Sequence, residues 1–202
     1  MYEVGLEFRK NGQKIQILEK KENIRTGEFK DNEEIYGIDL SRLSHLEADI
    51  CSNCPNLMWV RLSPALTHIP RGAFEKCRNL EYVEIPKMLL CIGERAFYFC
   101  SFKEFRLPPR LKTIEDSAFL NCKELLRVVL PSGLESIGKR AFSGCNSLSE
   151  AIFDGNPLHI GEKAFNKNCT LVCERGSSAG HYALENGNPI TYRNRSKGQG
   201  TA

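Results

Sequence analysis

The most reactive side chains in this chain belong to nine cysteines and four histidines. Cys51 and Cys54 form a C-x-x-C pair, a spacing shared by zinc ligands and redox-active dithiols. A structural zinc ion requires four ligands, and neither a second C-x-x-C pair nor a histidine pair follows in the sequence. We therefore predict no metal site and no cofactor.

The spacing of the other polar residues does not indicate catalysis either. The histidines are scattered singly, at His45, His68, His159 and His181. No periodicity brings a serine, a histidine and an aspartate together, and the recurring Ile-Gly-x-x-Ala-Phe phrase lacks the glycine spacing of a phosphate-binding loop. The sequence predicts that the protein is not an enzyme and has no catalytic residues.

That recurring phrase also determines how the chain positions its side chains. The pattern Ile-(Gly)-x-x-Ala-Phe-x-x-Cys returns at steps of 22 or 23 residues, measured between Phe74, Phe97, Phe119, Phe142 and Phe165. A fixed period of this size predicts a solenoid, because each short unit can bury its apolar face only by stacking on its neighbours. We expect the five rings to lie one above another in the interior.

Six cysteines follow the same period, so their side chains should face one direction in every repeat. They are Cys54, Cys77, Cys100, Cys122, Cys145 and Cys169. We predict a buried column of free thiols here, since an odd cysteine count and a repeated position do not suggest a disulfide framework. Cys91 and Cys173 lie outside this column, next to apolar positions, and are predicted to serve packing.

Between the cysteines, the pattern Leu-x-x-Val-x-Ile-Pro predicts one short strand per repeat. Val and Ile alternate with exposed positions, and the following proline ends the strand. Successive strands have the same direction and long connections, so they should form one parallel sheet. A weaker copy spans 43–62, with Ile50 in place of the phenylalanine, and a divergent first copy begins at Ile24.

The predicted organisation has four parts. Residues 1–20 form a hairpin cap that turns at Asn11-Gly12, and residues 21–175 form a solenoid of about six to seven coils. Residues 176–192 form a C-terminal cap, with a short helix that starts after Ser177 or Ser178 and stops at Gly187. Residues 193–202 are predicted to be a disordered tail.

The composition limits the classes of partner that the sequence predicts. Charged residues make up 26% of the chain and the formal net charge is +3, which is too mild and too mixed for nucleic-acid binding. No apolar stretch reaches the length of a membrane span. The absence of an apolar segment near Met1 and the free cysteines favour a cytoplasmic location.

Residues pointing away from the core on the predicted strands form two columns. Asp39, Arg61, Glu84 and Arg106 alternate in charge, as do Glu104, Arg127 and Glu150, while Trp59 and Tyr82 are neighbours. The charges can neutralise each other or form a polar binding surface, and the N-terminal cap can cover the aromatic pair. The predicted partner-binding residues are Trp59, Arg61, Tyr82, Glu84, Glu104, Arg106 and Arg127.

The repeat resembles the BspA-type leucine-rich repeat over about residues 21–192. The ending Gly-Ser-Ser-Ala-Gly-His-Tyr-Ala, residues 176–183, resembles that family's closing segment. The resemblance implies a right-handed coil that is mostly β and irregular, has little helix, and carries a parallel sheet on its concave face. It also implies adhesion or ligand binding at a bacterial or protozoan surface.

Two functions follow from the sequence. The first is a non-catalytic, monomeric module that binds a protein partner through its concave face. The alternative is an extracellular adhesin-type fragment that binds a host protein or glycan. The compartment differs between them: the cytoplasm fits the first, and the cell surface or secretion fits the second.

Overall fold

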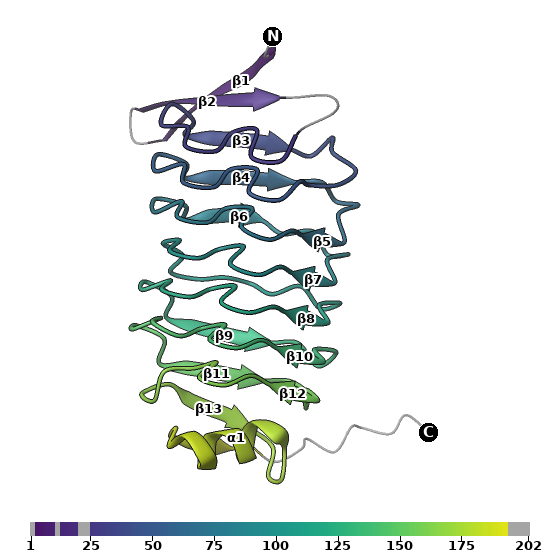
Figure 1. Ribbon diagram of the computed structural model, residues 1–202, viewed down its shortest axis with the longest axis vertical. Helices are drawn as coiled ribbons and strands as arrows, with labels where there is room; N and C mark the ends of the chain where they lie inside the picture. Colours follow the sequence, from purple (N-terminus) through teal and green to yellow (C-terminus); the bar gives the residue numbers. More distant parts are fainter. Residues whose placement is uncertain (1–2, 11–12, 20–24, 194–202) are drawn as a thin grey trace.

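The structure is a computed structural model that describes residues 3–10, 13–19 and 25–193, with side chains described from residue 25 onward. The chain forms a stack of coils that runs from strand β1 at the N-terminal end to helix α1 at the other end (Figure 1). Most coils have a longer strand on one side, here called the front face. This is the face predicted to be concave. The predicted solenoid is therefore confirmed.

The front strands pair in parallel, in register from coil to coil. They are β3 (Gly37–Leu40), β4 (Trp59–Leu62), β6 (Tyr82–Glu84), β9 (Arg127–Leu130), β11 (Glu150–Phe153), β13 (Thr170–Cys173) and β14 (Ile190–Tyr192). Most of their inward residues are fully buried, as the alternation predicts, with Val60 and Val128 as examples; Val83 of β6 and Ile190 of β14 are only partly buried.

The prediction of a single parallel sheet was wrong in two respects. The front strands divide into two sheets, ordered β1-β2-β3-β4-β6 and β14-β13-β11-β9. A third parallel sheet lies on the back face, where two-residue strands end on the isoleucine of the repeated phrase. These strands are β5 (His68–Ile69), β7 (Cys91–Ile92), β8 (Thr113–Ile114), β10 (Ser136–Ile137) and β12 (His159–Ile160). A constant repeat length stacks these positions in register, so their backbone groups pair.

The phenylalanine column fills the interior. Phe74, Phe97, Phe119 and Phe142 have no exposed surface, and Phe165 is almost as buried. Consecutive rings stack nearly in parallel, with centroids 5.1 Å apart for Phe119 and Phe142 and 5.2 Å apart for Phe142 and Phe165. The predicted alignment of the rings is confirmed, and burial of such large rings supplies much of the stability of the stack.

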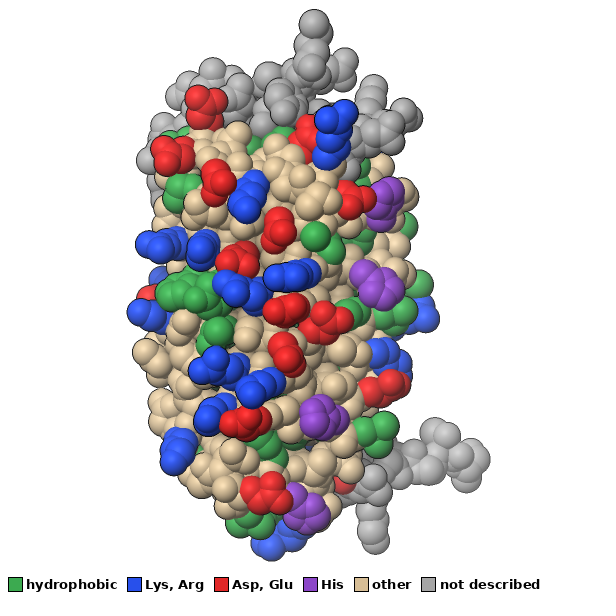
Figure 2. All heavy atoms as spheres, in the orientation of Figure 1, with side chains coloured by type: hydrophobic (Ala, Val, Ile, Leu, Met, Phe, Trp, Pro, Cys, Tyr) green, Lys and Arg blue, Asp and Glu red, His purple; other side chains and the backbone are tan. Residues whose placement is uncertain are grey.

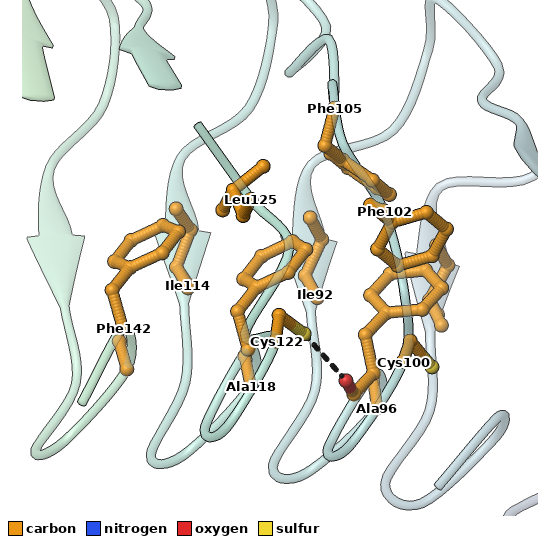
Figure 3. Packing of buried hydrophobic residues seen from close by; sticks show 14 of the residues in the cluster. Ile92, Ala96, Cys100, Phe102, Phe105, Ile114, Ala118, Cys122, Leu125 and Phe142 are labelled. Carbon is orange, nitrogen blue, oxygen red and sulfur yellow. Dashed lines mark hydrogen bonds between the residues drawn. The ribbon is translucent and has the colours of Figure 1, made fainter. Parts of the chain in front are cut away.

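The cysteine column lies beside the rings. The six repeated cysteines are buried, and all nine cysteines, which lie within residues 25–193, are free thiols. Several thiols donate to the backbone carbonyl at the phenylalanine position of the preceding coil; Cys122 Sγ lies 3.0 Å from Phe97 O (Figure 3). The same bond joins Cys145 to Phe119 O at 3.1 Å. The cysteines thus tie each coil to the one before it.

One position differs from the sequence prediction. Cys51, and not Ile50, occupies the phenylalanine position of its coil, because Cys51 O accepts from Cys77 Sγ at 2.9 Å. The amide of Cys51 also donates to Ala73 O, as the amide of Phe74 donates to Ala96 O. Ile50 therefore takes the alanine position, and Cys51 belongs to the core column.

The two ends of the stack are built differently. Strands β1 (Glu3–Lys10) and β2 (Gln13–Glu19) are antiparallel, and β2 pairs in parallel with β3. The predicted Asn11-Gly12 turn lies outside the described residues. At the other end α1 (Ser178–Asn186) is capped by the Ser177 side chain, which accepts from the Gly180 amide, and it ends at Gly187 in the left-handed conformation. Of the predicted tail, all but Arg193 lies outside the described residues.

Candidate interaction surface

The front face places the predicted outward residues in register. Trp59 pairs with Tyr82 across β4 and β6, and Arg61 pairs with Glu84. On the other side of β4, Arg61 faces Asp39 of β3. The side chains at these positions therefore meet across successive coils, as the alternation of the strands requires.

Arg61 is the centre of a charged cluster on β3, β4 and β6. Its guanidinium lies 3.0 Å from a carboxylate oxygen of Asp39 and 3.0 Å from one of Glu84. It also stacks 5.2 Å from the centroid of the Trp59 ring. Partial burial opposes ionisation of Asp39, but hydrogen bonds from Ser41 and the charge of Arg61 outweigh it, so the pKa of Asp39 is lowered.

The two aromatic residues differ in exposure. Tyr82 is 51% exposed, whereas Trp59 is half-buried beneath the Arg61 guanidinium. The main chain of the N-terminal hairpin joins the sheet at the β3 edge, two strands away from Tyr82. The front face thus carries one open aromatic ring and one ring already engaged by a cation.

The charge ladder does not continue past β6. Arg106 and Glu104 are exposed, and neither forms an ion pair with any residue in the range 25–193. Arg127 pairs instead with Glu150, at 3.4 Å. Elsewhere, charges pair repeatedly between coils, as between Lys139 and Glu162 at 3.0 Å, and acidic and basic side chains are intermixed along the molecule in Figure 2.

The ladder stops because the front sheet is broken at residues 103–107. Only one bridge, between Glu104 and Arg127, joins this segment to β9, and no strand pairs with the far side of β6. Phe105 stands where the two neighbouring coils have a valine, and Phe102 where they have a leucine. The two rings pack on Phe97 at centroid distances of 5.1 and 5.4 Å (Figure 3). Such bulky side chains displace the backbone from the ladder.

The break leaves a hollow on each side of the segment. One, of about 440 Å³, lies between β6 and the segment and is lined by Tyr82, Val83 and Phe105 among others. The second, of about 520 Å³, lies towards β9 and is lined by Leu126, Val129 and Pro131 among others. Glu104 and Arg106 line both hollows. Leu126 is 51% exposed and Val129 42%, so this part of the surface is unusually apolar.

The sequence analysis missed this break, although two signals for it are present. Only one residue separates Cys100 from Phe102, whereas two separate Cys77 from Leu80. Two phenylalanines replace aliphatic residues in the same coil. The structure therefore brings Trp59, Arg61, Tyr82 and Glu84 together, and it separates them from Glu104, Arg106 and Arg127 by the first hollow.

The remaining reactive groups are packed rather than clustered for chemistry. Burial raises the pKa of Cys51, Cys77, Cys100 and Cys122, which keeps these thiols protonated, and the last three donate to backbone carbonyls. Among residues 25–193, no group of three or more His, Cys, Asp or Glu side chains is arranged to hold a metal ion. The helix present in that part of the chain is too short to cross a bilayer.

The repeated unit identifies the family. The model of the BspA type leucine rich repeat region matches residues 44–172 in six copies. The chain belongs to the BspA-type leucine-rich repeat family. No curated protein matches this BspA-type chain.

Solved structures with the same fold come from several bacteria. A leucine-rich repeat protein from Bacteroides ovatus is 22% identical, with a TM-score of 0.62, over 84% of this chain and 53% of its own. A leucine rich cell surface protein from Faecalibacterium prausnitzii is 22% identical, with a TM-score of 0.58, over 77% of this chain and 40% of its own. The chain thus spans about half or less of these two relatives. The T. pallidum leucine rich repeat protein is 19% identical, with a TM-score of 0.64, and covers 95% of both chains.

Proposed function

We propose that this BspA-type repeat protein is a non-catalytic module that binds a protein partner through its front face. The observation that carries the proposal is the combination of exposed Tyr82, Leu126 and Val129 with a sheet that is broken between them. Interfaces between proteins typically centre on such aromatic and aliphatic side chains, with charged residues around them.

The proposal assigns roles to the predicted residues. Tyr82 supplies a rigid apolar contact, and Trp59 supports the guanidinium of Arg61. The ion pair of Arg61 with Glu84 is exposed on both sides, so a partner can exchange it for its own charges at little cost. Glu104, Arg106 and Arg127 extend the surface beyond the first hollow. The module acts as a monomer.

Site-specific photo-cross-linking tests this function. A benzophenone amino acid is placed in turn at Arg61, Tyr82, Arg106 and Val129 on the front, and at Lys139 and Lys163, which follow the back strands β10 and β12. The chain is then irradiated with an extract of the source cells, and the adducts are sequenced. One partner species captured from front positions, and not from the control positions, supports the proposal. Equal labelling from both sides contradicts it.

A second candidate function is adhesion outside the cell to a host protein or a glycan. It is favoured by one structural relative, which is named as a leucine rich cell surface protein. The exposed Tyr82 ring and the Trp59 ring can also stack on sugar rings. Binding to a glycan array that is lost on Tyr82→Ala, with the fold unchanged by circular dichroism, supports adhesion. An array without binding contradicts the glycan form of this function.

A further inference from the structure

We propose that the protein has a second interaction surface, on the turns that follow the back strands β5 and β7, and that it binds an acidic segment of a partner protein. The aromatic rings of Tyr98 and Phe99 form this surface together with the cations Lys76, Arg78 and Arg95, and we call it the turn patch. None of the five residues lines either hollow of the front face. The inference therefore goes beyond the proposed function.

The first support is that the fold does not require aromatic side chains at these positions. Phe99 and Asn121 occupy equivalent places in successive coils, and both take the left-handed conformation, with φ of 59° and 62°. Asparagine tolerates this conformation, whereas a bulky aromatic residue is strained there. The residues equivalent to Tyr98 in other coils are Ser52, Glu75, Leu120 and Ser143. The same turn thus forms without rings, and a strained ring on the surface points to a function.

The second support is that the rings make one surface with two arginines. The Tyr98 and Phe99 rings meet edge to face, with their centroids 4.6 Å apart. The guanidinium of Arg95 lies 4.5 Å from the Tyr98 centroid, and that of Arg78 lies 5.9 Å from the Phe99 centroid. Both rings remain partly exposed. Aromatic residues and arginine are the types that are enriched where proteins bind one another.

The third support is charge, which indicates the kind of ligand. The carboxylate of Glu75 lies 2.7 Å from Arg95 and 3.9 Å from Lys76, so one anion serves two cations. Arg78 is exposed and forms no ion pair with any residue in the range 25–193. Glu81, the next acidic residue along the chain, lines the first hollow on the front face. Three cations of the turn patch therefore have one carboxylate between them.

The acidic residues of the following turns lie towards the back strands. Glu94, Glu115 and Asp116 line a separate hollow of about 430 Å³ beside β8 and β10. Glu94 is also paired, with Arg71 at 3.7 Å. The turn patch thus keeps an excess of positive charge next to its rings, and the complementary ligand carries carboxylates beside an apolar side chain.

The test uses fluorescein-labelled peptides in anisotropy titrations with the full chain. The parent peptide carries glutamates on both sides of one phenylalanine, and matched peptides replace every glutamate with glutamine or the phenylalanine with alanine. We expect the first change to weaken binding about tenfold and the second about fivefold. A single-stranded RNA of the same charge is the competing ligand, since bases also stack on rings and arginines.

Three substitutions locate the binding. Phe99→Asn places in this turn the residue type that Asn121 supplies in the next coil, so it should keep the melting temperature while weakening the parent peptide about fivefold. Arg78→Glu should weaken the peptide about tenfold. Arg140→Glu, in the equivalent turn two coils beyond Arg95, changes the net charge equally and should have less than a twofold effect.

Each other outcome overturns a named part of the inference. Equal binding of the glutamate and glutamine peptides overturns the acidic ligand, and tighter binding of the RNA overturns a protein as its source. Equal effects of Arg78→Glu and Arg140→Glu overturn the assigned place. A lower melting temperature of Phe99→Asn with unchanged peptide binding shows that the ring serves the fold. None of these results bears on the front face, so the proposed function stands or falls by its own cross-linking test.

Discussion

The ring column and the front sheet run side by side through the same coils, yet only the ring column is continuous. Phe97 stacks on Phe119 at 5.3 Å in the coils where the front sheet is broken. Phe102 and Phe105 add further ring contacts there, including one between Phe105 and Phe119 at 4.8 Å. Apolar burial thus holds the coils together where strand pairing is lost. The core can therefore be kept while the front face changes.

Removing a core ring from the coil where the front sheet is broken should have the largest effect on stability. Phe97→Ala should lower the free energy of unfolding by about 3–5 kcal/mol, since Phe97 is fully buried and touches four other rings. Urea denaturation followed by circular dichroism measures the change. Tyr82→Ala, on the front face, is the control and should change stability far less. If the two substitutions lowered the free energy of unfolding equally, ring burial would not be the dominant source of stability.

The back face offers a second test, because the main chains of successive coils lie in close contact there. A Cβ atom at Gly138 would lie 2.4 Å from Asp116 N, a main-chain atom that cannot move aside cheaply. Gly138→Ala should therefore destabilise the stack by about 1–3 kcal/mol, the usual scale of overpacking. Gly133→Ala is a matched control, since its new Cβ would meet nothing closer than 3.7 Å. Equal melting temperatures for the two variants would contradict tight contact on the back face.

The hydrogen bonds donated by the buried thiols should contribute less to stability. Cys122→Ala removes the bond to Phe97 O, but that carbonyl keeps the Cys100 amide as a donor at 3.2 Å. We expect a loss of about 1 kcal/mol in the free energy of unfolding. Cys122→Ser keeps a donor at the same place and should recover part of that loss. A serine variant less stable than the alanine variant would mean that packing, not the hydrogen bond, is what Cys122 supplies.

Periodicity explains which features the sequence could predict. The ring and thiol columns follow from residue type and constant spacing, so Phe74 to Phe165 and Cys54 to Cys169 were placed correctly. Cys51 was misassigned because the neighbouring Ile50 is also apolar. Its three-residue distance to Cys54, the same as from Phe74 to Cys77, was the decisive signal.

The break in the front sheet at residues 103–107 could not be derived from spacing in the same way. Whether a strand joins a sheet depends on how far bulky side chains displace its backbone, which is a property of packing among Phe97, Phe102 and Phe105. The two-residue back strands were missed for a related reason: they have no alternation of their own and form only because coils stack in register. The break in the front sheet and the short back strands both depend on packing between coils, so they were the hardest features to predict.

The smallest expected effect on stability comes from removing a charge in the ion-paired cluster on β3, β4 and β6. In Asp39→Asn the side-chain oxygen can still accept from the Ser41 amide, so the substitution mainly removes the charge facing Arg61. The free energy of unfolding at neutral pH should fall by less than about 1 kcal/mol, because Arg61 and Glu84 are partly exposed.

The pH dependence of this variant separates the ion pair from packing. The pKa of Asp39 is below its ordinary value of 3.8 in the folded protein. The unfolded chain therefore takes up its proton first as the pH falls, and the stabilising contribution of Asp39 is lost below about pH 4. The stability difference between the wild type and Asp39→Asn should be constant from pH 7 to about pH 5 and should shrink below about pH 4. A difference that stays constant down to pH 2 would show that the charge of Asp39 is not its cause.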